Sequence, residues 1–404
     1  MRWFILAACL PMLACLGTAQ AWSVYVKPLQ SEYGLSMWQA QLVFGTSVFV
    51  FCTWILVAGR LQDRLGPRLV SLAGAVLVGV AYAITYFGGE HYFFLWLGMG
   101  LVYGVACATA YTCPIATAIK WFPDHRGLVA GLTTAAFACG PIIVQAIAQP
   151  LLTRGWRVLS VIGLIGSIYT PTLVLTALLL STPPESAQQR QSVADFRFGS
   201  ILKDARVWLL FAGMLCGTFP YLLVMGNVRL IAEEWQLPGV IALGVPTMAA
   251  ANTLGRIFWG HLLDKFGTIP TMRASQILLL VSVAGLALAQ SHPYLFLVSA
   301  AGIGLGYASN FAIYPGTIAK TYGSSLLGSI FPLVMFAQGI SALGPVVGGK
   351  LSDLTHSYMP GVALSGCVVL AGAALCHSMR KCFETPVEPK AIFNSSEEQP
   401  GVTA

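Results

Sequence analysis

The chain has 404 residues, of which 56% are apolar and 9% are charged. A water-soluble domain carries roughly 25% charged residues, so the composition excludes a soluble enzyme and predicts a protein embedded in the lipid bilayer. The net charge of +7 does not indicate nucleic-acid binding, because membrane proteins collect basic residues in their cytoplasmic loops. The ten cysteines are scattered without metal-binding spacing, and we expect no metal and no cofactor.

Twelve segments have the roughly 20 apolar residues that a membrane-spanning helix needs. They run over 3–26, 38–59, 67–87, 93–119, 128–150, 157–180, 206–228, 238–262, 271–290, 293–318, 325–349 and 359–379. We therefore predict an all-α membrane protein. Its expected parts are a six-helix bundle over 1–180, a linker over 181–205, a second six-helix bundle over 206–382 and a disordered tail over 383–404.

The first segment has two interpretations. A basic start, an apolar run and Ala19-Gln20-Ala21 are typical of a signal peptide with its cleavage site. The segment that follows, Trp22 to Pro28, continues as a plausible helix end. Removal of the first helix would also leave an odd number of spans. We expect an uncleaved first helix.

One loop motif occurs twice, 201 residues apart. Gly59-Arg-Leu-Gln-Asp63-Arg64-Leu-Gly66 and Gly260-His-Leu-Leu-Asp264-Lys265-Phe-Gly267 both read G-x-x-x-D-[R/K]-x-G between apolar segments. Pro114 and Pro315 repeat at the same offset. The duplication predicts two halves related by pseudo-symmetry.

Charge predicts the orientation. If both termini are cytoplasmic, sixteen Lys and Arg side chains lie on that side and five on the other, with Arg256 alone inside a span. This bias is the one that cytoplasmic loops show. Together with the lack of long loops, it favours the plasma membrane, and a bacterial inner membrane in particular.

Two six-helix halves with this motif after the second and eighth helices resemble the major facilitator superfamily, over nearly the whole chain. Three segments narrow the resemblance to the oxalate/formate antiporter family, which is related to the monocarboxylate transporters. They are Ala21–Leu29, Lys120-Trp-Phe-Pro-Asp-His-Arg-Gly127 and Asn252-Thr-Leu-Gly-Arg256-Ile-Phe-Trp-Gly260. The resemblance implies alternating access by two rocking bundles around a site near mid-membrane.

Arg256 is the candidate substrate ligand. It lies eight residues before Asp264, which is about 12 Å along a helix, and a cation inside a span costs at least about 2.5–3.5 kcal/mol. All fifteen acids fall in predicted loops, span ends or the tail, so its partner is expected to be an anionic substrate, bound through two parallel N–H bonds. The alternatives are bonds to backbone carbonyls or extension toward the cytoplasm.

Other polar residues of the spans are weaker candidates for substrate contact. Asn252 lies one turn before Arg256 on the same face. Tyr111, Tyr307, Asn310 and Tyr314 lie in the fourth and tenth helices, where a core residue bonded to a neighbouring helix is the more common role.

Two positions depart from the related families. Gln338 stands where the oxalate exchanger has a second cation, and Gln20 aligns with a proton-linked lysine of animal monocarboxylate transporters. One cation balances one negative charge, so Gln338 favours a monocarboxylate over oxalate. Gln20 weakens the case for proton symport and leaves coupling by anion exchange, by protonation of the substrate or through loop groups.

The loop motifs are expected to control conformational switching rather than substrate choice. Gly59 and Gly260 would allow close helix approach, and Gly66 and Gly267 would allow a tight turn. Asp63 and Asp264, with Arg64 and Lys265 nearby, are expected to cap or pair helix ends.

The predicted function is secondary active transport of small carboxylates by a monomer. A carrier of sugars or drugs on the same scaffold is the alternative. Drug-cation carriers would be expected to hold a membrane acid, and the sugar-porter sequence after the sixth helix is matched only by Pro184-Glu185-Ser186.

Overall fold

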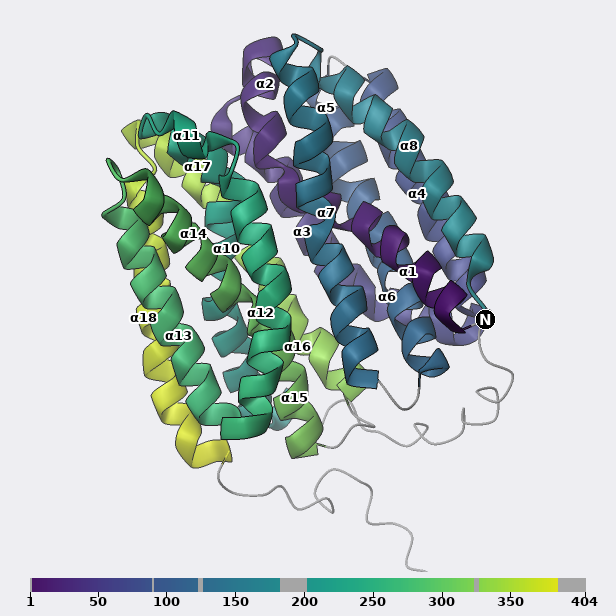
Figure 1. The fold of residues 1–404 in the computed structure, drawn as a ribbon, viewed down its shortest axis with the longest axis vertical. Helices are drawn as coiled ribbons and strands as arrows, with labels where there is room; N and C mark the ends of the chain where they lie inside the picture. The colour runs from purple at the N-terminus through teal and green to yellow at the C-terminus, as the bar shows by residue number, and fades with distance from the viewer. Residues whose placement is uncertain (1, 89–90, 123–125, 182–201, 323–326, 384–404) are drawn as a thin grey trace, which may run out of the picture.

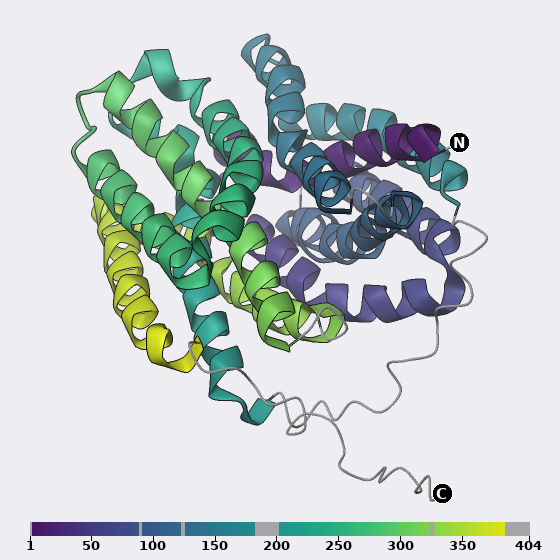
Figure 2. The same ribbon diagram turned by 60° about the horizontal axis from the view of Figure 1, so that its bottom comes forward.

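The computed structural model describes residues 2–88, 91–122, 126–181, 202–322 and 327–383. Every regular element in these ranges is a helix, which confirms the all-α prediction. The helices form two groups that lie side by side, coloured purple to blue and teal to yellow in Figure 1. Figure 2 shows the same two groups turned toward one end.

The N-terminal bundle comprises ten helical elements. They are α1 (Arg2–Leu16), the 3-10 helix η1 (Gly17–Ala21), α2 (Ser23–Tyr33), α3 (Met37–Leu65), α4 (Pro67–Gly88), α5 (Tyr92–Leu95), the π-helix η2 (Trp96–Val102), α6 (Tyr103–Trp121), α7 (Arg126–Thr153) and α8 (Val158–Leu179).

The C-terminal bundle comprises nine elements among the described residues. They are α10 (Ala205–Glu234), α11 (Pro238–Ile241), α12 (Gly244–Phe266), α13 (Thr268–Ala287), α14 (Pro293–Ala308), α15 (Asn310–Tyr322), α16 (Leu327–Ser341), α17 (Leu343–Thr355) and α18 (Met359–Phe383).

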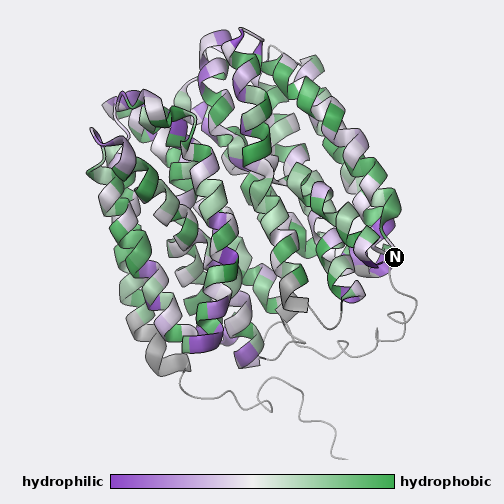
Figure 3. Cartoon of the chain, in the orientation of Figure 1, coloured by the Kyte–Doolittle hydropathy of each residue, from purple (hydrophilic) through white to green (hydrophobic). Residues whose placement is uncertain are grey.

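Eleven spans in the described ranges are long and apolar enough to cross a membrane. Helix α12, with 23 residues, is not one of these eleven, because Asn252, Arg256 and His261 lower its hydropathy. It lies in the chain between two of them. With α12 the expected twelve spans are reached. Figure 3 shows hydrophobic residues along the length of the helices, with hydrophilic ones gathered toward their ends.

The two ends of the molecule differ in the loops that they carry. The motif end carries Gly66 and Gly267, which follow α3 and α12, and the far end carries Gly34, which follows α2, and Gly155, between α7 and α8. The labels α2 and α11 mark the far end in Figure 1. Helix α3 runs from the far end to the motif end, as does α12.

The first span is broken rather than continuous over 3–26 as expected. Helix α1 ends at Leu16 and a 3-10 turn follows. At this point Gly17 packs against Gly140 of α7, where a Cβ atom on Gly140 would lie 2.6 Å from the Ala14 carbonyl oxygen. The Leu16 carbonyl instead accepts a hydrogen bond of 3.0 Å from the Tyr103 hydroxyl.

The tenth and eleventh spans are also interrupted. Between α14 and α15, the Ser309 hydroxyl donates to the Gly306 carbonyl at 2.7 Å and the Asn310 amide donates to the Tyr307 carbonyl at 2.9 Å. Short polar side chains of this kind compete with the backbone ladder. Between α16 and α17, the Ser341 hydroxyl bonds both Ala337 and Leu215 carbonyls.

The crossing of the first span with α7 gives a stability prediction. Gly140→Ala should lower the free energy of unfolding by about 1–3 kcal/mol, because the added methyl group forces two packed backbones apart. Thermal unfolding of the purified protein in detergent would measure this. Gly131→Ala is the matched control on the same helix, since nothing lies within 4 Å of its Cβ position. It should be neutral or stabilise by up to about 1 kcal/mol, and equal effects of the two changes would contradict the prediction.

Candidate functional site

Arg256 lies in the middle of α12 and is only 7% exposed. Within the described ranges no carboxylate forms an ion pair with it, and its Nε and Nη1 atoms have no hydrogen-bond partner. The guanidinium lies over the ring of Phe311, 4.3 Å from the ring centroid. A cation over an aromatic face is partly stabilised, yet two of its nitrogens remain available for an anion.

The N-terminal bundle supplies a hydroxyl to the same place. Tyr111 of α6 is held edge-on by Phe51 and Phe137, with ring centroids 5.3 and 4.9 Å away. Its hydroxyl faces the Arg256 guanidinium. The cation therefore lies at the interface between the bundles, with its charge supplied by one bundle and a hydroxyl by the other.

A pair of stacked tyrosines lies beside Arg256. The rings of Tyr221 and Tyr307 are 3.7 Å apart and tilted by 8°. Both are fully buried, and the Tyr307 hydroxyl has no hydrogen-bond partner among the described residues. The Tyr221 hydroxyl donates to Gln20 Oε1 of η1 at 3.2 Å.

Asn252 is also fully buried, one turn before Arg256. Its side-chain nitrogen and oxygen lack hydrogen-bond partners in the described part of the chain, although the Tyr221 hydroxyl lies close by. Buried polar groups in native proteins are nearly always bonded. Several unpaired ones around a single buried cation indicate a place built for a polar ligand.

The remaining predicted site residues are placed differently. Gln338 of α16 is buried with an unpaired Oε1, and its neighbour Gly339 packs against Cys52 of α3, so it also lies between the bundles. Asn310 of α15 donates its side-chain amide to the Tyr307 carbonyl of α14. Tyr314 is buried beside Cys216 and Cys376, on the side of α10 and α18, and does not join the cluster around Arg256.

Sequence reasoning missed two members of this cluster. Tyr221 could have been found from the repeat, because it lies 201 residues after Gln20, which had already been singled out. Phe311 carried no such signal, since a phenylalanine in a span is ordinarily a packing residue.

The loop motifs have the expected turn geometry and few contacts. Gly66 and Gly267 have φ angles of 84° and 78°, which favour glycine. Arg64, Asp264 and Lys265 are exposed, and the side chain of Asp63 lies outside the described part. Gly59 and Gly260 have nothing within 4 Å of a Cβ position, so the expected close helix approach is not made in this conformation.

Polar contacts join the two bundles at the far end. Lys27 of α2 pairs with Glu233 of α10 at 2.8 Å, and Arg229 reaches both Glu233 at 3.0 Å and Gln149 of α7 at 2.5 Å. Asp353 of α17 accepts hydrogen bonds from the first N–H groups of α3.

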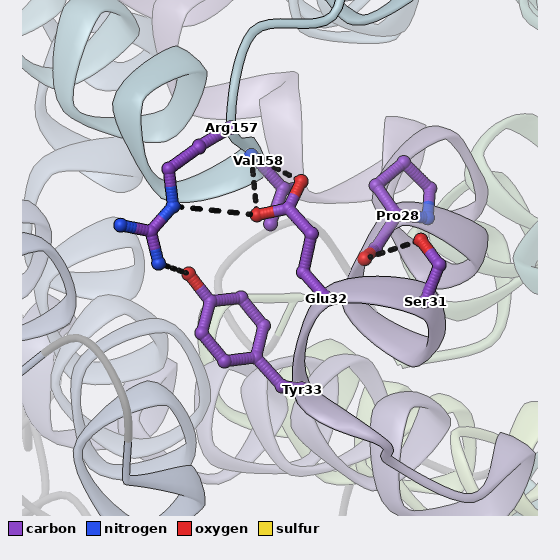
Figure 4. A network of polar contacts seen from close by, with 6 residues as sticks. All are labelled: Pro28, Ser31, Glu32, Tyr33, Arg157 and Val158. Atoms are coloured by element: carbon purple, nitrogen blue, oxygen red, sulfur yellow. Dashed lines mark hydrogen bonds and ion pairs between the residues drawn. The ribbon is translucent and has the colours of Figure 1, made fainter.

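Carboxylates also cap helices within each bundle at the far end. Glu32 accepts from the Val158 N–H at 2.9 Å, where α8 begins, and lies 4.0 Å from the Arg157 guanidinium (Figure 4). Glu234 does the same for the Tyr358 N–H in the other bundle at 3.0 Å. An acid at a helix N-terminus is stabilising, so each bundle fixes its own far end.

Among the described residues, the hydrogen bonds and ion pairs between bundles lie at the far end or at mid-depth. The deepest are Tyr221 with Gln20 and a 3.7 Å contact between Cys139 and Thr253. At the motif end, no atom of the described residues lies within 4 Å of the Cβ positions of Gly59 and Gly260. The structure is therefore a state closed at the far end.

The Major Facilitator Superfamily model matches residues 7–345. The chain belongs to this superfamily of membrane transporters, which agrees with its two bundles and its twelve spans.

Individual relatives are distant. The chain is 27% identical over 349 residues to the oxalate:formate antiporter of Oxalobacter formigenes, covering 80% of this chain and 78% of that protein. It is 27% identical over 365 residues to apicoplast pyruvate carrier 1 of Toxoplasma gondii, covering 71% and 65%. A crystal structure of the nucleoside transporter NupG superimposes with a TM-score of 0.70 at 12% identity, over 93% of this chain and 100% of that one, and this likeness shows the fold.

The unpaired state of Arg256 gives a stability prediction. Arg256→Met should raise the free energy of unfolding by about 1–3 kcal/mol, because it removes buried donors that have no partner. Thermal unfolding without added anions would measure it. Arg229→Met is the matched control, since that arginine is bonded to Glu233 and Gln149, and it should destabilise. Destabilisation by Arg256→Met would mean that Arg256 is structural.

Proposed function

We propose that this protein is a secondary active transporter of small carboxylate anions, most of all monocarboxylates. The observation that carries the proposal is Arg256, a buried cation without an acidic partner among the described residues. A carboxylate would complete it, because two parallel N–H bonds match its two oxygens. A neutral solute such as a sugar, or a cationic drug, would leave the charge uncompensated.

The number of charges supports a monocarboxylate over oxalate. Gln338 is neutral and stands at the position where the resemblance implies a second cation, and the N-terminal bundle offers the Tyr111 hydroxyl rather than a charge. A second carboxylate would have to lose its hydration without a counter-charge, which is costly. The relatives transport oxalate, formate and pyruvate according to their names, which agrees with a small carboxylate.

Transport would proceed by alternating access. The contacts at the far end would break and others would form around the loop motifs, so that Gly59, Asp63, Gly260 and Asp264 control the switch. The charge distribution supports a cytoplasmic motif end with both termini on that side, in a bacterial inner membrane. The domain limits proposed are 180, 206 and 382. With this orientation, the polar contacts that join the bundles at the far end support a carrier that is closed to the outside.

The coupling proposed is anion exchange, or proton movement on the substrate itself. Asp and Glu side chains among the described residues lie toward helix ends, as Glu233 and Asp353 do at the far end, so the site offers no carboxylate for a proton. The carrier is proposed to act as a monomer, because each molecule holds a complete site.

Counterflow in proteoliposomes tests the substrate class. Vesicles are loaded with an unlabelled monocarboxylate, dicarboxylate or sugar, and uptake of labelled acid is measured. Monocarboxylates should drive uptake best. Arg256→Gln should reduce it at least about 100-fold, equivalent to the loss of roughly 3 kcal/mol from a charge-assisted bond.

Two controls sharpen this experiment. Arg256→Lys keeps the charge and loses the bidentate geometry, so it should retain partial transport. Arg157→Gln at the far-end surface should leave substrate preference unchanged. Transport that survives Arg256→Gln, or a preference for neutral solutes, would refute the proposal.

A further inference from the structure

We propose that Tyr221 is a further substrate ligand and that its hydroxyl couples substrate binding to the opening of the far end. This inference rests on the proposed function, because the ligand it requires is a carboxylate at Arg256. It assigns Tyr221 two alternative acceptors, Gln20 in this structure and the substrate when it is bound.

The first support is the place of the Tyr221–Gln20 hydrogen bond. The two residues are 201 positions apart, which is the offset of the internal repeat. They are therefore equivalent positions in the two halves, and a bond between equivalent positions lies at the pseudo-twofold axis. It joins η1 of one bundle to α10 of the other, at the centre of the interface that must open and close.

The second support is the fixed position of the Tyr221 ring. It is fully buried and stacked on Tyr307 at 3.7 Å with an interplanar angle of 8°. The O–H bond can still rotate about the C–O axis while the ring stays in place. Asn252 lies beside the hydroxyl, and the Arg256 charge acts on it. An anion on Arg256 would thus meet the hydroxyl without rearrangement of the aromatic pair.

The third support is that the Tyr221 hydroxyl has only one hydrogen to donate. A tyrosine hydroxyl has one hydrogen and donates to one acceptor at a time. A carboxylate is a stronger acceptor than the amide oxygen of Gln20, because bonds to an ionised group are shorter and stronger. Substrate binding would therefore take the hydrogen bond away from Gln20 and weaken closure at the far end. An empty site would return the hydrogen to Gln20.

Spin-label distance measurements across the far end test this coupling. Labels are placed at Arg154→Cys after α7 and at Ser291→Cys between α13 and α14, two exposed positions in different bundles. Cys367, which is exposed, is first replaced by serine, and Cys382 is replaced together with it. Distances are recorded without ligand and with sodium formate, acetate or pyruvate.

Three variants separate the possible causes. Tyr221→Phe removes the donor, and Gln20→Leu removes the acceptor but keeps the tyrosine. Tyr103→Phe is the matched control, because its hydroxyl bonds Thr18 and the Leu16 carbonyl within one bundle.

Without ligand, Tyr221→Phe and Gln20→Leu should each raise the ratio of far-end-open to far-end-closed molecules about two- to tenfold, the equivalent of one hydrogen bond. Tyr103→Phe should keep the wild-type ratio. Only Tyr221→Phe should also weaken carboxylate binding, and it should abolish the shift that the carboxylates cause in the wild type. If one variant fails to fold, the other still tests the bond.

The coupling would be overturned if Tyr221→Phe and Gln20→Leu both kept the wild-type ratio of open to closed molecules, or if Tyr103→Phe shifted that ratio equally. Unchanged carboxylate affinity in Tyr221→Phe would overturn its role as a ligand. Failure of the proposed function would give a different result. Carboxylates would then leave the wild-type distances unchanged, and Arg256→Gln would not affect transport. The ratios of Tyr221→Phe and Gln20→Leu without ligand do not depend on the substrate.

Discussion

The arrangement at the centre of this protein depends on one buried charge. Arg256 lies inside an apolar bundle with two nitrogens unpaired among the described residues and its guanidinium over the ring of Phe311. Such a charge is tolerated in a span when something compensates for it. Around it, Asn252 and Tyr307 are buried with polar atoms that have no partner in the described part of the chain. We propose that a ligand, rather than a neighbouring side chain, satisfies these groups together.

The sequence predicted much of this architecture because the relevant signals are local or repeated. Long apolar runs predict spans whatever their packing, and the duplicated motif predicts two halves. Arg256 stood out because a charge in a span is rare. The repeat offset of 201 residues also relates Gln20 to Tyr221, and equivalent residues at the pseudo-twofold axis must lie near each other. Helix α12 was predicted as a span from its apolar residues, although Asn252, Arg256 and His261 lower its hydropathy.

The rest could not be predicted because it depends on packing between segments distant in the chain. The break after Leu16 is tied to the approach of Gly17 and Gly140, more than 100 residues apart. Tyr314 and Tyr307 lie seven residues apart, about two helical turns, yet the break at Ser309 lies between them and they face different neighbours. Phe311 is a site residue only because the guanidinium lies over it. Side-chain direction, which sequence spacing alone does not give, decided each case.

The distribution of contacts also explains how the molecule can switch. Helices pack closely within each bundle, as Gly74 does with Ala110 and Gly255 with Ala308, and also across the interface, where Gly45 lies against the Ala342 carbonyl. Between the bundles, the contacts include polar bonds such as Lys27–Glu233, Gln41–Asn227 and Tyr221–Gln20. A hydrogen bond contributes only about 0.5–1.5 kcal/mol net, because its groups can find other partners when it breaks. Separation of packed helices would leave voids that no ligand fills. Because the polar bonds of the interface can exchange partners, we propose that a small anion binding at Arg256 changes the free energy of the interface rather than that of the packing within each bundle.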